Sequence, residues 1–139
     1  MKQDIAFDPV AGVSIAIVPD TAEPGADGIT AWTVYLLNSN DTPLDTVLIA
    51  AEGYGTQPTG EAVRTSTLRY HFEQVGPQSA TPVELIDPAV FHLTNQYWVS
   101  YYQGGRIFDK KFIFVPDSLV PANLSPLPLL AGQLGVLHS

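Results

Sequence analysis

The residues best suited by type and spacing to bind a ligand occupy alternate positions between Thr65 and His71. The set is Thr65, Thr67, Arg69 and His71, and residues two apart in a strand project from the same face of the sheet. Hydroxyl groups and an arginine guanidinium can together bind a carboxylate. Threonine and arginine also commonly cover the solvent side of a sheet. The pattern therefore predicts either a carboxylate-binding row or an ordinary solvated face.

Aromatic side chains offer a second kind of binding surface. Trp32, Tyr54, Trp98 and Tyr102 would form a stacking platform for a small ligand or a carbohydrate if they stood exposed together. Aromatic residues also commonly fill the core, and burial of both tryptophans would exclude the platform. The candidate binding residues are Thr65, Thr67, Arg69, His71, Trp98 and Tyr102.

Motifs for catalysis are missing from the sequence. No G-x-S-x-G nucleophile elbow is present, and no two of the fourteen acidic residues form a recognisable catalytic pair. His71, His92 and His138 lie far apart, without the H-x-H or H-E-x-x-H spacing of a zinc site. Convergence of a histidine with a carboxylate in space stays open. We therefore assign no catalytic residue and expect the protein not to be an enzyme.

Motifs for cofactors and metals are missing as well. The glycines between Gly53 and Gly60 match neither G-x-G-x-x-G nor G-x-x-x-x-G-K-[ST]. Asp20, Glu23 and Asp27 match no Ca²⁺-binding loop, so we interpret them as a solvated acidic loop. There is no cysteine, which excludes a thiolate metal site and a disulfide. We predict no cofactor, no cofactor-binding residue and no metal ligand.

The net charge of −8 is unevenly distributed. Residues 1–61 contain nine acidic side chains and one lysine, whereas residues 62–139 contain five acidic and five basic side chains. Nucleic acids and anionic membranes require a basic surface, so we expect neither as a partner. The N-terminus has no apolar signal segment, and no apolar run is long enough to span a membrane. We therefore expect a cytoplasmic protein.

The strongest structural pattern is a hairpin between Tyr97 and Pro116. Two runs rich in aromatic and β-branched residues flank Gly104-Gly105, a pair that suits the positive φ angles of a type I′ turn. A two-residue turn fixes which residues of the two strands lie opposite each other. The resulting register gives the hairpin one aromatic face, which needs a second layer to cover it. The aromatic face consists of Tyr97, Val99, Tyr101, Phe108, Phe112 and Phe114, interrupted by Lys110. The other face carries Trp98, Ser100, Tyr102, Asp109 and Lys111.

Shorter patterns predict the rest of the fold. Strands are expected at 5–7, 13–18, 29–37, 44–51 and 63–72, and a further strand ends near 86, before a helical turn that begins at Asp87. Turn-forming residues after residue 37 indicate that 29–37 and 44–51 pair as a second hairpin. We therefore predict an all-β, antiparallel β-sandwich, Ig-like, with about seven or eight strands, over residues 1–116.

Residues 117–139 form an apolar, proline-rich C-terminal tail. After Asp117 the tail has no acidic or basic side chain except His138, yet it is rich in leucine and valine. A disordered segment is normally polar, so we expect the tail to be docked. It either lies on its own sandwich or is exchanged with a second subunit in a homodimer.

Three segments together resemble a known family. They are 31–38 (AWTVYLLN), the glycines of Gly53-Tyr54-Gly55 with 65–69 (TSTLR), and 97–116 around YWVS and FDKKFIFVP. These segments resemble a family of short bacterial proteins of uncharacterised function, which are often labelled as a phenylalanyl-tRNA synthetase alpha subunit. The resemblance spans about residues 31–116, implies a bacterial source and brings no catalytic residue to this chain.

The sequence as a whole favours a small non-catalytic β-sandwich that acts as an interaction or structural module. Its partner would be another protein or a second copy of the chain, contacted through the C-terminal tail. The alternative is a domain that binds a small ligand or a carbohydrate, with the exposed aromatic and polar residues as its site.

Overall fold

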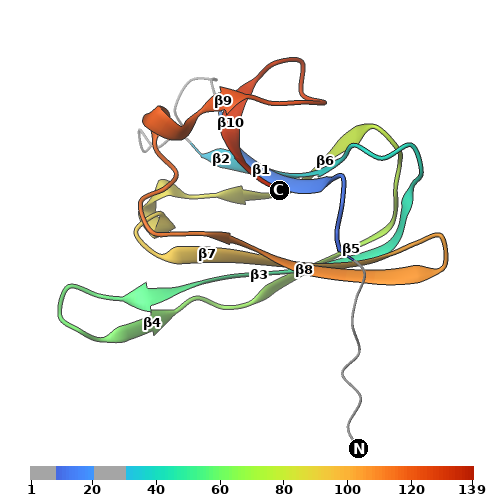
Figure 1. Cartoon of the computed structure of the whole chain (residues 1–139). Helices are drawn as coiled ribbons and strands as arrows, with labels where there is room; N and C mark the ends of the chain where they lie inside the picture. The colour runs from blue at the N-terminus through green and yellow to red at the C-terminus, as the bar shows by residue number, and fades with distance from the viewer. Residues whose placement is uncertain (1–8, 21–30) are drawn as a thin grey trace, which may run out of the picture.

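Two antiparallel sheets stack face to face in the computed structural model of the protein, which describes residues 9–20 and 31–139 (Figure 1). The first sheet, in the order β6-β2-β1-β10-β9, contains β1 (Val13–Pro19), β2 (Trp32–Asn38), β6 (Ser79–Ile86), β9 (Ser125–Pro126) and β10 (Leu134–His138). The second contains β3 (Leu44–Thr56), β4 (Ala62–Arg64), β5 (Leu68–Val75), β7 (Thr94–Gln103) and β8 (Arg106–Phe114). Its order is β4-β3-β7-β8, and β5 pairs with β3 beside β4. Two 3₁₀ turns, η1 (Pro88–Val90) and η2 (Pro121–Asn123), complete the described elements.

This arrangement confirms the all-β, Ig-like sandwich. β1, β2 and β6 take the places of strands A, B and E of that fold, and β3, β7 and β8 those of C, F and G. The described residues form ten strands rather than seven or eight, because the predicted strand at 63–72 is divided into β4 and β5 and the tail adds β9 and β10. The predicted strand at 5–7 lies outside the described residues. No helix in the described part of the chain is long and apolar enough to cross a membrane.

The predicted hairpin between β2 and β3 is wrong. β2 pairs with β1 and β6, whereas β3 pairs with β4, β5 and β7, so the chain crosses between the sheets after Asn38. The buried Asn38 side chain holds this crossing. Its Nδ2 donates to the carbonyl oxygens of Thr42 and Gly76, each at 3.0 Å, and its Oδ1 accepts from the backbone nitrogen of Asn40 at 3.0 Å. The turn-forming residues therefore build a corner between the sheets, because local turn chemistry does not decide which strands pair.

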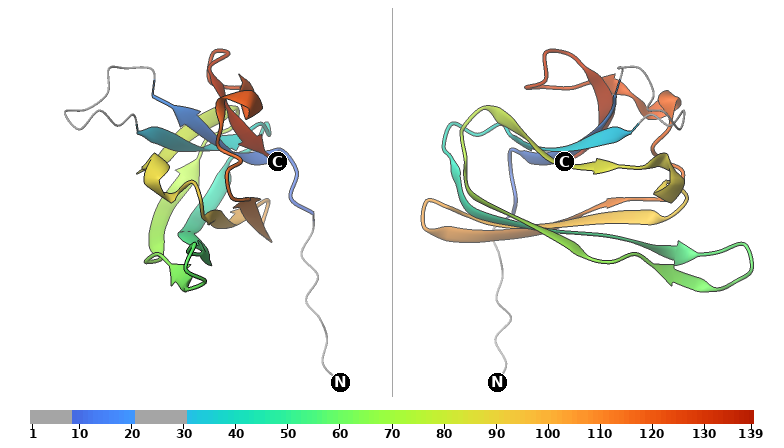
Figure 2. Two further views of the ribbon diagram at one scale, coloured as in Figure 1. Left: turned by 90° about the vertical axis from the view of Figure 1, so that its left-hand side faces the viewer. Right: turned by 180° about the vertical axis from the view of Figure 1, so that it is seen from behind.

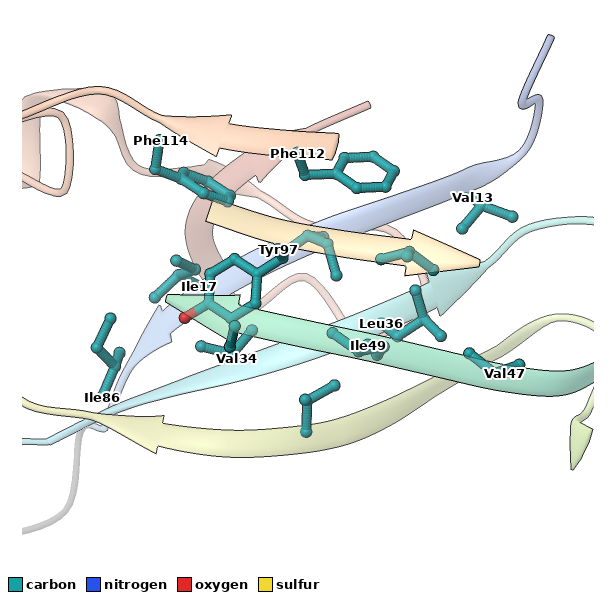
Figure 3. Packing of buried hydrophobic residues seen from close by; sticks show 14 of the residues in the cluster. Val13, Ile17, Val34, Leu36, Val47, Ile49, Ile86, Tyr97, Phe112 and Phe114 are labelled. Atoms are coloured by element: carbon teal, nitrogen blue, oxygen red, sulfur yellow. The ribbon is translucent and has the colours of Figure 1, made fainter. Parts of the chain in front are cut away.

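The β7–β8 hairpin has the predicted register. Tyr97 lies opposite Phe112, and Gly104 and Gly105 adopt φ angles of 58° and 76° at the turn. Such angles strain any residue with a Cβ, which is why glycine occupies both positions. Tyr97, Phe112 and Phe114 lie among the buried side chains of the core (Figure 3). The aromatic face of the hairpin is thus covered by the other sheet.

The core fills the space between the sheets. Ile17, Val34 and Leu36 project from the first sheet and meet Val47 and Ile49 of β3 (Figure 3). All five side chains are at most 1% exposed. Because residues alternate along each strand, their neighbours in sequence are directed toward the outer faces.

The C-terminal tail lies on the first sheet of its own chain. β10 pairs antiparallel with β1, and Val136 lies opposite Ile17. Before β10, Leu127 packs on the outer face of the sheet in a cluster with Ala16, Val18 and Leu37. Gly135 permits this close approach, since a Cβ there would lie 2.6 Å from Leu127 Cδ1. The tail therefore covers the edge of β1 and part of the outer face of the first sheet (Figure 2).

Replacing Phe112 with alanine should lower the free energy of unfolding by about 3–5 kcal/mol, because its ring is fully buried in the core. Ile113→Ala is the matched control: Ile113 is the next residue of β8, faces outward and is 37% exposed. Its loss should stay below about 1 kcal/mol. Urea titration measures both losses, and equal small losses would mean that the two faces of the hairpin are misassigned.

Leu127→Ala should cost about 2–5 kcal/mol, because the side chain is 4% exposed beneath the tail. Leu134→Ala, at a tail position that is 49% exposed, should cost much less. Thermal melting at several protein concentrations measures both changes. A concentration-dependent melting temperature would favour exchange of the tail between subunits over docking within one chain.

Candidate functional site

A row of four side chains crosses the outer face of the second sheet. Arg69 of β5 lies opposite Ala50 of β3. Ala50 lies in turn opposite Trp98 of β7, and Trp98 lies opposite Lys111 of β8. Directly paired residues share a face of the sheet, and Ala50 faces solvent because both of its neighbours in β3 are buried. The row therefore places Ala50 between a cation and an indole, with a second cation beyond the indole.

The small side chain of Ala50 leaves a depression between its larger neighbours. A cavity of about 580 Å³ opens there, within the range of about 300–1,000 Å³ that is usual for ligand pockets. We call it the cationic groove, and its lining residues are Ala50, Glu52, Tyr54, Arg64, Thr67, Arg69, Gln96, Trp98 and Lys111. One end lies against the β3–β4 hairpin, which projects past the first sheet (Figure 2). Three of the chain's six lysine and arginine residues line this groove, whereas the chain as a whole carries a net charge of −8.

Trp98 is held in a defined orientation although it is 42% exposed. Its indole Nε1 donates to Asp109 Oδ1, and Ser100 Oγ donates to the same oxygen at 2.7 Å. Lys111 Nζ lies 4.5 Å from the centroid of the indole ring, in cation–π contact. These contacts order the indole before any ligand arrives, which lowers the entropic cost of binding.

Glu52 provides a carboxylate within the groove and partly neutralises it. Its Oε2 accepts a hydrogen bond from Thr67 Oγ1 at 3.1 Å and lies 3.5 Å from Arg64 Nη1. The Arg64 guanidinium also lies 5.8 Å from the centroid of the Tyr54 ring. No described carboxylate pairs with Arg69, whose guanidinium is therefore the cation in the groove that is most available to an anionic ligand.

The structure brings together three of the six candidate binding residues. Thr67, Arg69 and Trp98 line the groove. His71 lies on the same face, opposite Leu48, in the next row toward the hairpin turn. Tyr102 is also exposed on this face but lies still farther along, opposite Asp45.

Thr65 faces away from the other candidates, so the predicted row of four does not form. The chain leaves the strand after Arg64 and resumes at Leu68, which breaks the alternation between residues 65 and 67. Thr65 Oγ1 accepts a hydrogen bond from Gly53 N at 2.8 Å and donates to Ser66 O at 3.1 Å. Its side chain borders a different cavity, between the sheets.

Trp32 is not part of an aromatic platform. Its side chain is 9% exposed and packs edge to face against Phe91, with ring centroids 5.1 Å apart. The exposed tryptophan is Trp98 alone, since the chain has two. A platform that needs both tryptophans is therefore excluded, whereas one built on Trp98 is compatible with the structure.

Several residues that line the groove were not among the candidates predicted from the sequence. Lys111 was recognisable from the hairpin register, which places it on the face of Trp98. Gln96 was recognisable in the same way, because it lies two residues before Trp98 in β7 and so shares its face. Arg64 carried no such signal, because its face depends on the break in the strand at 65–67, which no local pattern encodes.

A bulge in β6 directs a carboxylate into the interior. Glu84 pairs with Val34 and Pro82 pairs with Tyr35, which leaves Val83 as the extra residue. Val34 faces the core, so its partner Glu84 also faces inward. A carboxylate in this position needs hydrogen-bond donors from the opposite sheet, because leaving it unpaired would be costly.

Two phenol groups supply those donors. Tyr70 OH donates to Glu84 Oε1 at 2.6 Å, and Tyr97 OH donates to Glu84 Oε2 at 3.0 Å. Burial, together with the hydrogen bond to Glu84, raises the pKa of Tyr70 to about 12. Burial and the charge of Glu84 raise the pKa of Tyr97 well above its ordinary value. Both phenols therefore remain donors at neutral pH, and this phenol–carboxylate bridge joins β5 and β7 to β6.

The cavity between the sheets borders this bridge. It has a volume of about 270 Å³, and its polar lining includes Thr65, Glu84, Asp87 and Asn95. No group of three His, Cys, Asp or Glu side chains among the described residues is placed to hold a metal ion. Residues 21–30 of the predicted acidic loop lie outside the described residues.

The histidines do not meet a carboxylate in the described part of the chain. His71 and His92 make no hydrogen bond or ion pair with a described acidic residue. The His138 ring packs edge to face against Phe112 and Phe114, with centroids 5.4 and 5.7 Å apart. General acid–base chemistry with a histidine requires such a partner or a substrate proton within reach.

Comparison with protein-family models, with curated proteins and with solved structures finds no match to this chain. The resemblance to the family of short bacterial proteins stays a prediction from the sequence.

Tyr97→Phe should destabilise the fold by about 1.5–3 kcal/mol, because it removes a hydrogen bond to a charged group. Tyr101→Phe is the matched control: this tyrosine is equally buried in β7, but its hydroxyl has no hydrogen-bond partner among the described residues. Its removal should be neutral or stabilising. Urea titration of the two variants measures the difference, and equal effects would show that the bridge adds nothing to stability.

Alkaline pH should weaken the bridge. The pKa of Tyr70 is raised to about 12 in the folded state, against about 10 in an unfolded chain. Its contribution to stability is therefore complete below about pH 10 and is lost as the pH rises through about 12. The free energy of unfolding should fall over this interval in the wild type and fall less in Tyr70→Phe. Identical pH profiles for the two proteins would contradict the assignment.

Proposed function

We propose that the protein is a non-catalytic binding domain that holds an anionic ligand in the cationic groove. The observation that carries this proposal is the convergence of Arg64, Arg69 and Lys111 beside the exposed Trp98. In a chain with net charge −8 and six basic side chains, the gathering of three of them in one groove favours a local function over general solubility.

The rigidity of the groove supports binding rather than chemistry. Its floor is formed by β3 and β7, which are paired on both sides, so the backbone beneath the ligand is fixed. Among the described residues, the polar side chains of the groove lining include arginine, lysine, glutamine, threonine and one carboxylate, but no histidine, serine or cysteine. The single carboxylate, Glu52, is already bonded to Thr67 and Arg64. This set of side chains suits recognition by charge and hydrogen bonds.

A protein interface on the same face is the second candidate. Exposed apolar side chains lie on the same face of the sheet as the groove, namely Leu48, Tyr102, Ile107 and Ile113, which are 51%, 45%, 42% and 37% exposed. Aromatic and aliphatic residues around a basic centre are typical of protein-binding surfaces. The tail contributes less to this argument than the sequence suggests, because its two buried leucines, Leu119 and Leu127, pack within their own chain.

Arg69→Ala and Trp98→Ala should each weaken binding to an acidic probe by about ten-fold or more, since each removes a direct contact in the groove. The panel consists of immobilised polygalacturonate, poly-glutamate, dextran sulfate and neutral dextran, with binding followed by surface plasmon resonance. Arg106→Ala is the control, because it removes the same charge outside the groove.

Saturable binding of at least one acidic probe, lost in both groove variants and kept in the control, would support the proposal. Binding to none of the probes, or equal loss in all three variants, would contradict it. Cleavage of a bound probe, detected by mass spectrometry, would contradict the non-catalytic assignment.

A further inference from the structure

The backbone beneath the cationic groove is not available to a ligand. At Ala50 and Trp98 the strands β3 and β7 pair with each other, and each also pairs on its other side with β5 or β8. An extended peptide is usually bound by adding its main chain to a free strand edge. A peptide placed over the middle of the sheet would find no such edge, and its own amide groups would lack main-chain partners. The ligand must therefore be recognised by side chains alone.

The side chains of the groove match the chemistry of a sugar. A pyranose ring has apolar C–H faces, which pack on an aromatic ring, and hydroxyl groups, which both donate and accept hydrogen bonds. Trp98 provides an ordered and partly exposed indole. In the next row of the sheet, Gln96 lies opposite Glu52, and Thr67 donates to Glu52. An amide, a carboxylate and a hydroxyl beside an indole therefore offer donors and acceptors to several hydroxyl groups.

The cations indicate that this sugar carries a carboxylate. Arg69 and Lys111 stand at the two ends of the row, three strand spacings or about 14 Å apart at the backbone, and both side chains line the groove. Lys111 Nζ lies over the indole ring, 4.5 Å from its centroid, so this cation is next to any ligand that contacts Trp98. The Arg69 guanidinium has no described carboxylate partner, and its planar N–H donors can form two parallel hydrogen bonds with a carboxylate.

The charge of the whole protein limits how acidic the ligand is. With a net charge of −8, the chain repels densely charged polymers beyond the groove itself. Arg69 and Lys111 can neutralise the negative charge of one carboxylate per sugar, but not the charge of several sulfates per sugar. A weakly charged acidic polysaccharide therefore fits better than a sulfated one.

From these observations we infer that the cationic groove binds a uronic-acid oligosaccharide. Arg69 and Lys111 hold the carboxylate, one sugar face packs against Trp98, and Gln96 and Thr67 bind hydroxyl groups. This inference rests on the proposed function, because it assigns the ligand class of the same groove.

The experiment compares oligogalacturonate of defined length with its methyl ester by isothermal titration calorimetry. The ester keeps the sugar ring and removes the charge, so it should bind about ten-fold to 100-fold more weakly. In Arg69→Ala, binding of the acid should weaken toward the level of the ester, because only Lys111 then remains to hold the carboxylate, while binding of the ester is little changed. In Trp98→Ala the binding of the acid and of the ester should weaken by the same factor, because the indole contacts the sugar ring and not the carboxylate. Arg69→Lys keeps the charge but loses the planar pair of guanidinium N–H donors. Its affinity for the acid should lie between those of the wild type and Arg69→Ala.

Two controls show that a loss of binding is local. Arg106→Ala should bind as the wild type does, and the melting temperature of each variant shows whether it is folded. The expected pattern is a preference for the acid over the ester that falls most in Arg69→Ala and is kept in Trp98→Ala and Arg106→Ala.

Other outcomes separate this inference from the proposed function. If poly-glutamate binds in an Arg69-dependent manner and oligogalacturonate does not, the sugar assignment is overturned and the proposed binding domain stands. If dextran sulfate binds most tightly and Trp98→Ala has no effect, the groove is an electrostatic surface and the sugar assignment is again overturned. If no acidic probe binds, the proposed function and the inference fall together.

Discussion

The alternation of side chains along β3 and β7 is the constraint on which the rest of the structure depends. Burial of Ile49 and Ala51 in the core requires Ala50 to face outward, and burial of Tyr97 and Val99 does the same for Trp98. A shift of one residue in either strand would expose the core and bury the groove residues at once. The packing that stabilises the sandwich therefore also positions the candidate binding surface. This coupling explains how a binding face can be ordered without a mobile loop.

Buried polar groups determine how the two sheets are placed relative to each other. Asn38 satisfies backbone groups at the crossing from β2 to β3, and Glu84 accepts hydrogen bonds from Tyr70 and Tyr97 across the interior. Apolar contacts tolerate small sliding movements of one layer over the other, whereas hydrogen bonds to an inward-facing, partly buried carboxylate do not. The bulge at Val83 is what makes the second interaction possible, because it turns Glu84 inward. These few groups give the sandwich a defined stacking.

The distribution of charge is organised by the same sheet. The basic side chains are few, and half of them line one groove, although they come from three separate segments of the chain. Arg64 and Arg69 arrive on β4 and β5, and Lys111 arrives on β8, at the far side of the sheet. The acidic residues of the N-terminal half keep the protein negative overall. A local basic groove on an acidic molecule favours selective contact with a moderately acidic ligand over general adsorption to polyanions.

The sequence by itself determined most strands of the sandwich, the faces of the β7–β8 hairpin and the class of the fold, because alternation and turn chemistry are local properties of the chain. It also identified Arg69 and Trp98 as candidates and placed Lys111 on the face of Trp98. It did not predict the division of 63–72 into β4 and β5 or the tail strands β9 and β10. Only the tertiary structure decided that β2 and β3 separate into different sheets, that Trp32 is buried and that Thr65 leaves the row. Those outcomes depend on which strands distant in sequence become neighbours, and that choice follows from the packing of the whole core. The convergence of Arg69, Ala50, Trp98 and Lys111 is such an outcome, since it requires the order β5-β3-β7-β8, which no segment of the chain specifies alone.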